Sequence, residues 1–497
     1  MDNTPIGPDN NPNIARNIKT GFASYWGIWV ILAVLYVLIT LKISDFKPHA
    51  GKKMAVTEAV GPPVFGEPGY VGSERCKDCH WLKHDTWKNT LHSKFMQPSN
   101  SYTVMGDFQK NNTLTVTVSD ASPKRAGEAV ASTMFIRDGM YYVNTIGPDW
   151  ELHDYEVVNV LGVGRTQNYL AKFANGEIHV LPVQWNIKTT SWTNLNGLEN
   201  NIVGDGEYWS DTESIWQFKC GGCHVTGMDI NYDEANDQFD TTWADRGIAC
   251  EACHGPGSNH VKAASEYFDY EKDTIINPAK LPWWQRAMVC GQCHNWGTST
   301  AEVSEKKEGF PSQYSYSHGY RPGKALYLFY SENEGQKKKH HQQYNEWKTS
   351  KHGDVGIMCT NCHNVHSEEA TKVAMTKTTT DALCMECHVT LERRAAHRIH
   401  TFGSCVACHM PKTVGHEHSH TFEFVSPALT VAAGGLDKQP NSCNGCHHHK
   451  DSDPAQLAGF LEAAKKNDMP KPFAVHQRTG LEAILNALEE VRDNRNR

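Results

Sequence analysis

The hydrophobic and polar positions along the chain follow two different patterns. Residues 21–41 (GFASYWGIWVILAVLYVLITL) form an apolar run without a charged side chain. At about 1.5 Å per residue, a helix of this length crosses the roughly 30 Å hydrocarbon layer of a bilayer. Apolar and polar residues instead alternate in 113–118 (TLTVTV), while 135–143 and 178–183 also have β character. The patterns predict one membrane-spanning helix and a small β-rich region.

The apolar run at the N-terminus has two other readings, a cleaved signal peptide and a buried helix of a soluble domain. The run is longer than the roughly 7–15 residues of a signal-peptide core, and no A-x-A cleavage site follows it. We therefore expect an uncleaved transmembrane anchor at 21–43, after a cytoplasmic tail at 1–20. More basic residues follow the run than precede it, so the positive-inside rule would place the N-terminus outside, opposite to the expected cytoplasmic tail. The orientation therefore needs another argument.

The β-rich region is expected to be an insert at about 101–190. The dipeptide Asn175-Gly176 separates YLAKF from EIHVLPV, and Asn-Gly between apolar runs is a strong hairpin signal. The rest of the chain divides into a tether at 44–69, a domain at 70–450 and a C-terminal helical tail at 451–497. Within that tail, apolar residues at 481, 484, 485, 488 and 491 have helical spacing.

Composition changes this picture, because hydrophobic residues make up only 39% of a chain of 497 residues. Something other than side chains is therefore expected to fill part of the core. The net charge of −8 is small for this length and gives no reason to expect a nucleic-acid partner.

The cysteines all belong to one repeated motif, C-x-x-C-H. The paired cysteines are Cys76 and Cys79, Cys220 and Cys223, Cys250 and Cys253, Cys290 and Cys293, Cys359 and Cys362, Cys384 and Cys387, Cys405 and Cys408, and Cys443 and Cys446. The histidines that follow are His80, His224, His254, His294, His363, His388, His409 and His447. Because no cysteine is left over, the sequence excludes a disulfide framework and a free catalytic thiol.

C-x-x-C-H is the attachment signature of c-type haem. The two thiols form thioether bonds to the porphyrin, and the adjacent histidine becomes the proximal ligand of the iron. Zinc ribbons also use C-x-x-C pairs, but they do not require a histidine directly after each pair. The sequence therefore predicts eight covalent haems, and a fold that is mainly α and coil wrapped around them. The apoprotein is expected to fold poorly, because cofactor binding contributes folding free energy.

Haem attachment also gives the expected location. Haem is joined to c-type apoproteins on the outer side of the energy-transducing membrane. We therefore expect a single-pass protein of the inner (cytoplasmic) membrane, with the haem domain on the periplasmic or extracytoplasmic side.

The histidines outside the motifs are candidates for the sixth, distal ligand of each iron. Two of them lie in the related contexts W-x-x-T-x-H and W-x-x-S-x-H, and others lie close before or after a motif. The candidates are His92, His260, His352, His366, His397, His400 and His420. A second imidazole makes the iron low-spin and leaves no site for a substrate. Which histidine meets which iron stays open.

Seven stretches of this sequence resemble the octahaem c-type cytochromes. These stretches are YVGSERCKDCH (70–80), QNYLAKFANGEIHVLPVQWN (167–186), GIACEACHGPGSNHV (247–261), INPAKLP (276–282), VCGQCH (289–294), GSCVACHMP (403–411) and PNSCNGCH (440–447). The wider group includes cytochrome c-554, hydroxylamine oxidoreductase and pentahaem nitrite reductase. The likeness is greatest to multihaem cytochromes that are often fused to tetratricopeptide repeats, but the tail after His447 is too short for such an array.

Two functions follow from this resemblance. The first is an electron carrier, held in the lipid by its N-terminal helix, that links a quinol-oxidising membrane donor, such as a respiratory complex, to other redox proteins. The alternative is a multi-electron reductase or oxidase of a small nitrogen or sulfur compound, which needs one iron with an open distal position. Some relatives mark that haem with C-x-x-C-K, and none of the motifs here does so. The motifs of His224 and His294 have no histidine nearby in the sequence and are the first candidates for an open iron.

Overall fold

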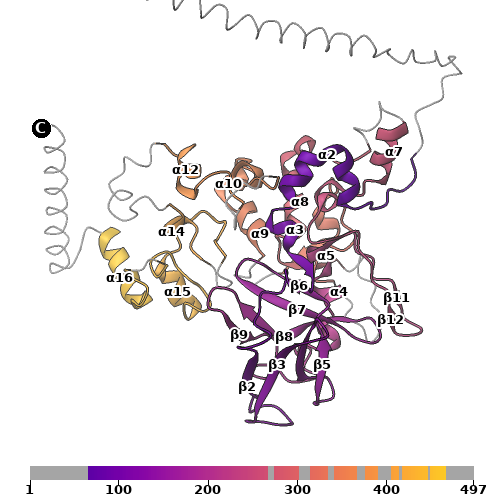
Figure 1. Ribbon diagram of the computed structural model, residues 1–497. Helices are drawn as coiled ribbons and strands as arrows, with labels where there is room; N and C mark the ends of the chain where they lie inside the picture. Colours follow the sequence, from indigo (N-terminus) through magenta and orange to yellow (C-terminus); the bar gives the residue numbers. More distant parts are fainter. Residues whose placement is uncertain are drawn as a thin grey trace, which may run out of the picture. The chain divides into compact units, whose positions relative to one another are not determined.

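The computed structural model describes residues 65–266, 274–300, 314–333, 341–366, 375–389, 405–412, 417–445 and 448–465. All of them belong to one unit that begins at Phe65 (Figure 1). The predicted tail at 1–20, the anchor at 21–43, most of the tether and the helical stripe at 481–491 lie outside the described residues. Within the described ranges, no helix is both long and apolar enough to span a bilayer.

A four-stranded antiparallel sheet forms the first layer of the β-rich region. Its strands run in the order β2 (Thr113–Thr117), β3 (Ala129–Arg137), β4 (Met140–Ile146) and β5 (Leu152–Glu156). The stretch expected to have β character at 135–143 is thus two strands joined by a turn. Asp138 and Gly139 have φ values of 53° and 81°, which fits the two-residue turn that Asp-Gly favours. Buried and exposed residues alternate along β3, so one face of this sheet turns inward.

A second, five-stranded sheet packs with the first. Its strands run in the order β1 (Met96–Pro98), β6 (Asn159–Leu161), β7 (Thr166–Lys172), β8 (Ile178–Asn186) and β9 (Ser191–Asn194), all antiparallel. Asn175-Gly176 lies in the turn between β7 and β8. Gly176 has a φ of 91°, and a side chain there would collide with the carbonyl of Phe239, so this turn requires glycine.

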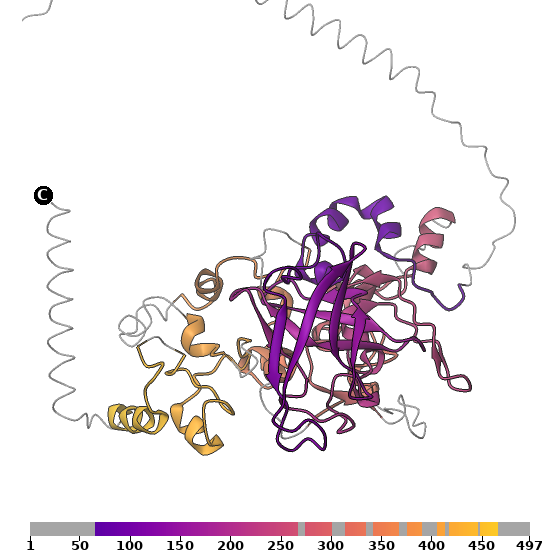
Figure 2. The same cartoon turned by 60° about the horizontal axis from the view of Figure 1, so that its bottom comes forward.

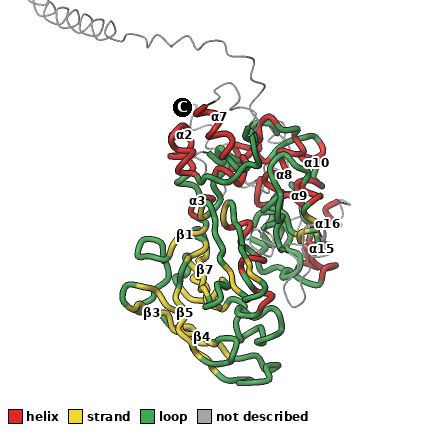
Figure 3. Tube along the Cα trace, turned by 90° about the vertical axis from the view of Figure 1, so that its right-hand side faces the viewer, coloured by secondary structure: helices red, strands yellow, loops and turns green. Residues whose placement is uncertain are grey.

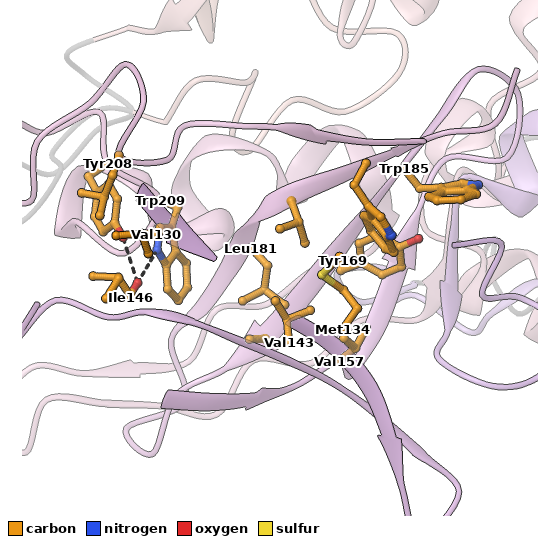
Figure 4. Close-up of a cluster of buried hydrophobic side chains, with 14 of the residues drawn as sticks. Val130, Met134, Val143, Ile146, Val157, Tyr169, Leu181, Trp185, Tyr208 and Trp209 are labelled. Carbon is orange, nitrogen blue, oxygen red and sulfur yellow. Dashed lines mark hydrogen bonds between the residues drawn. The ribbon is translucent and has the colours of Figure 1, made fainter. Parts of the chain in front are cut away.

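The core between the two sheets consists of apolar side chains from both (Figure 4). Met134 and Val143 of the first sheet lie with Tyr169 and Leu181 of the second, and all four are fully buried. The chain beyond β9 closes this core, because the Tyr208 hydroxyl and the Trp209 indole N–H both donate to the carbonyl of Ile146, at 2.8 and 3.0 Å. The region therefore has a conventional core of its own.

This β content is larger than the predicted mainly α and coil fold allows. The strands, purple in Figures 1 and 2, run from β1 to β9 and separate clearly from the helices when the chain is coloured by secondary structure (Figure 3). Three short pairings complete the described strands, namely β10 (Val225–Thr226) with β13 (Asp245–Arg246), β11 (Tyr232–Asp233) with β12 (Gln238–Phe239), and β14 (Gly297–Ser299) with β15 (Tyr330–Glu332), together with isolated bridges. The physical reason for the difference is that the insert buries its own side chains and needs no cofactor to fill it.

The described α-helices are short, and half of them contain all or part of a C-x-x-C-H motif. Those that contain all or part of a motif are α2 (Ser73–Trp87), α5 (Gly221–His224), α6 (Cys250–His254), α8 (Trp283–Gly291), α11 (Cys359–Cys362), α12 (Thr380–Met385) and α14 (Cys405–His409). The others are α3 (Leu91–Lys94), α4 (Trp216–Lys219), α7 (Ser258–Glu266), α9 (Gln343–Lys348), α10 (Lys351–Asp354), α15 (Pro427–Ala433) and α16 (Pro454–Lys465). Cysteines three positions apart share one face of a helical turn, which is the spacing that two thioether bonds on one porphyrin edge require.

Candidate functional site

In the first, third, fifth and seventh C-x-x-C-H motifs, one helix carries both cysteines. In the first motif, His80 departs from helical geometry, with φ −110° and ψ 36°, directly after Cys79. In the fifth motif, His363 is extended, with φ −106° and ψ 147°. The described cysteines carry no disulfide, so their thiols are available for thioether bonds.

In the part of the chain that the structure describes, five motif histidines each face a histidine from elsewhere in the chain. The ring centroids are 6.2 Å apart for His80 and His260, 6.3 Å for His294 and His92, 6.3 Å for His254 and His366, 6.3 Å for His363 and His420, and 5.9 Å for His388 and His352. Two metal–imidazole bonds of about 2 Å each, plus the reach from each nitrogen to its ring centre, add up to about 6 Å. The residues present therefore fit an iron held between two imidazoles.

The other ring nitrogen of several of these histidines has a hydrogen-bond acceptor. His254 Nδ1 lies 2.8 Å from the carbonyl of Ile276, and His420 Nδ1 lies 2.9 Å from that of His418. His294 Nδ1 lies 3.2 Å from Oε1 of Gln343. An acceptor at Nδ1 keeps the proton on that nitrogen and leaves the Nε2 lone pair for a metal.

Burial keeps these imidazoles neutral, which is the form that binds a metal. Burial lowers the pKa of His92 to about 4, with a further contribution from His294. It also lowers the pKa of His420 to about 4, and the pKa values of His254 and His366 shift in the same direction for the same reason. At neutral pH these side chains are ready to coordinate without first losing a proton.

Thiols of different motifs lie in contact and connect the motifs in space. Side-chain contacts join the first motif to the third, the second to the fourth, the fourth to the fifth and the sixth to the seventh, through the pairs Cys76–Cys250, Cys223–Cys293, Cys290–Cys359 and Cys384–Cys405. Cys253 lies close enough to Cys293 for the two thiols to interact, and Cys362 interacts with Cys387. The Ser442 hydroxyl, next to the eighth motif, donates to the Cys408 carbonyl at 2.6 Å. The motifs thus form one continuous series, in which the fourth adjoins the second, third and fifth.

The second motif is enclosed by aromatic and apolar side chains. The Phe95 ring meets the His224 ring edge-on, with centroids 4.7 Å apart, and Trp216 lies 6.3 Å from the same imidazole. Cys220 packs on an apolar cluster that includes Leu170 and Ile178 of the five-stranded sheet. The β-rich region therefore covers this motif.

The predicted site residues are not all placed. His397, His400, Cys446 and His447 lie outside the described residues, whereas Cys405, Cys408 and His409 lie on α14 and Cys443 follows α15. His294, which has no candidate nearby in the sequence, faces His92 from α3. Sequence reasoning missed Gln343 and its neighbour Glu346, because no spacing relates either residue to a haem motif.

Parts of the chain match two family models. Residues 188–255 match "Cytochrome c554 and c-prime", and residues 352–393 match "Doubled CXXCH motif". The chain is 26% identical over 235 residues to the cytochrome c nitrite reductase subunit NrfA of Nitratidesulfovibrio vulgaris (strain Hildenborough), covering 42% of this chain and 38% of that protein. It is 22% identical over 196 residues to cytochrome c-552 of Aliarcobacter butzleri (strain RM4018), covering 33% and 39%. The matches thus span about two fifths of the length of these curated relatives.

A solved structure shares the fold. The outer cell wall cytochrome OcwA superposes with a TM-score of 0.55 at 22% sequence identity, covering 84% of this chain and 90% of that one. The likeness extends over most of the chain and concerns its architecture alone.

Proposed function

Because this chain is a multihaem c-type cytochrome, with covalently bound haem c and a part in electron transfer, we propose that it is a membrane-anchored octahaem electron carrier. The carrier takes electrons from a quinol-linked membrane donor and passes them to other redox proteins of a respiratory chain. Haem supplies the one-electron chemistry, and the protein holds each iron and adjusts its potential.

The observation that carries this proposal is the set of five opposed imidazole pairs. An iron between two imidazoles is coordinatively saturated, so it exchanges electrons and does not bind a substrate. His92, His260, His352, His366 and His420 are the distal ligands in this proposal. His397 and His400 remain candidates for the second, seventh and eighth motifs.

The series of contacting motifs supports the same function. Haems attached at neighbouring motifs lie close to one another, so that an electron hops from one to the next. In this series the fourth motif is a junction, because its two cysteines contact the second and the fifth motifs. Electrons that enter at one end therefore have a path to every motif.

The membrane location is part of the same proposal. The uncharged run at 21–41 supports a single membrane anchor with the haem domain on the periplasmic side. Removal of residues 1–43, with an independent secretion signal attached, is expected to release the haem protein from the membrane fraction into the soluble fraction. Full-length protein that is recovered in the soluble fraction contradicts the anchor.

The spin state of the oxidised, purified full-length protein tests the function. Haem quantification is expected to give eight haems per chain. Electron paramagnetic resonance is expected to show only low-spin iron, and the reduced protein is expected not to bind carbon monoxide. A high-spin signal from about one haem in eight, together with carbon monoxide binding, contradicts a function limited to electron transfer.

The alternative is a reductase or oxidase of a small nitrogen or sulfur compound, and the partial similarity to a nitrite reductase subunit favours it. Since five motifs have an imidazole opposite their own, an open iron must belong to the second, seventh or eighth motif. Turnover of nitrite, hydroxylamine or tetrathionate by a protein that binds carbon monoxide would establish the alternative. A protein that binds the gas but turns over none of the three would argue against it.

A further inference from the structure

Glu346 is a buried carboxylate on helix α9, with 7% of its surface exposed. Its Oε2 accepts the backbone N–H of His420 at 2.6 Å and the Ser419 hydroxyl at 3.0 Å. Its Oε1 accepts the Gln342 side-chain amide at 2.9 Å. A charge that is removed from water needs such donors, and the described residues supply these three to Glu346.

Glu346 lies next to a candidate distal ligand, because it contacts His420. The His420 ring lies opposite His363 of the fifth motif, and its Nδ1 is already engaged with the His418 carbonyl. The carboxylate therefore holds the Ser419 side chain and the His420 backbone. This contact joins α9 to a segment more than seventy residues further along the chain.

The same helix also reaches the fourth motif. Gln343 Oε1 lies 3.2 Å from His294 Nδ1, and the backbone N–H of Tyr344 donates to the His294 carbonyl at 2.8 Å. The fourth and fifth motifs contact each other through Cys290 and Cys359. Helix α9 thus contacts His294 of the fourth motif and His420, which faces the histidine of the fifth motif.

We propose that Glu346 is a positioning residue that holds His420 and lowers the reduction potential of the haem at the fifth motif. This inference rests on the proposed function, because it requires a haem at that motif. A fixed negative charge close to an iron favours the ferric state, which carries one more positive charge than the ferrous state. The effect is large where the charge is buried, since water screens it little.

Two variants of the full-length, haem-loaded protein test the inference, because they are expected to shift one haem reduction potential in opposite directions. Glu346→Gln removes the charge and is expected to raise the potential of one haem component in a spectroelectrochemical titration. Ser419→Ala removes a donor and leaves the charge less compensated, so the same component is expected to shift to a lower potential. Glu128→Gln is the matched control, because Glu128 is exposed in the β-rich region and pairs with Arg125 at 3.8 Å.

Opposite shifts in the two variants, with unchanged haem content and unchanged low-spin signals, support the inference. Shifts of the same sign, no shift in either variant, or loss of a low-spin signal without a change of potential overturn it. In those cases the carboxylate has a structural role and does not set the reduction potential. Ser419→Ala keeps the test decisive if Glu346→Gln does not fold. The proposed carrier function is judged separately, on the haem content and spin state of the unaltered protein.

Discussion

His254 and His366 face each other with ring centroids 6.3 Å apart and planes inclined by 24°. One belongs to the third C-x-x-C-H motif, and the other follows the fifth motif by three residues. A single iron between these two rings would therefore tie together segments that carry two different haems. This arrangement explains how short helices with little apolar surface form one body, since each coordinated iron acts as a cross-link.

Replacement of His366 is expected to open the iron at the third motif. In His366→Ala, one haem becomes high-spin in the oxidised protein and binds carbon monoxide once reduced, because its sixth ligand is gone. Electron paramagnetic resonance and carbon monoxide difference spectra measure both effects. His153→Ala is the control, since His153 is an exposed histidine of β5 that pairs with Asp149. Unchanged spectra in His366→Ala would show that another group holds this iron.

The angle between opposed imidazoles is expected to divide the low-spin signals into two classes. The planes are inclined by 15° for His80 and His260 and by 83° for His352 and His388. Nearly parallel rings split the iron d orbitals and give a rhombic signal, whereas nearly perpendicular rings leave them close in energy and give a highly anisotropic one. His260→Ala should therefore remove a rhombic component, and His352→Ala a highly anisotropic one. Loss of the same kind of signal in both variants would refute this assignment.

Removal of side-chain volume from the core of the β-rich region is expected to destabilise that region alone. Leu181 is fully buried between the sheets, and its replacement by alanine is expected to cost about 3 kcal/mol of local stability. Hydrogen exchange at amides of β7 and β8 should accelerate, while the haem spectrum stays unchanged. Leu152→Ala is the control, because Leu152 on β5 is 48% exposed. Loss of haem in Leu181→Ala would mean that the insert supports haem attachment directly.

One loop of the β-rich region is expected to loosen in acid. The backbone N–H groups of Lys110, Asn111 and Gln109 donate to the Asp107 carboxylate and lower its pKa below the usual value of 3.8. Because the folded-state pKa is the lower one, the stabilisation is complete above about pH 4 and is lost as the pH falls through the folded-state pKa. Hydrogen exchange of the three amides should accelerate over that range. Asp107→Asn should abolish most of the pH dependence, and an unchanged profile in that variant would exclude Asp107 as its origin.

The sequence alone determined the chemistry of attachment and part of the β structure. Thioether formation and proximal ligation are specified by five contiguous residues, so each motif can be recognised without the fold. The turn at Asn175-Gly176 and the strand at Thr113–Thr117 were predictable for the same reason, because turn chemistry and alternation act over a few residues. Asp138-Gly139 carries an equally local signal for the β3–β4 turn.

Only the tertiary structure decided which groups meet across a haem-sized gap. His92 lies close in sequence to the first motif, yet it faces His294 of the fourth motif. His260 follows the third motif, yet it faces His80 of the first. Spacing carries no information about such pairs, because packing between distant segments brings them together. The same holds for Glu346, because only the fold buries its side chain and brings it to the backbone of His420.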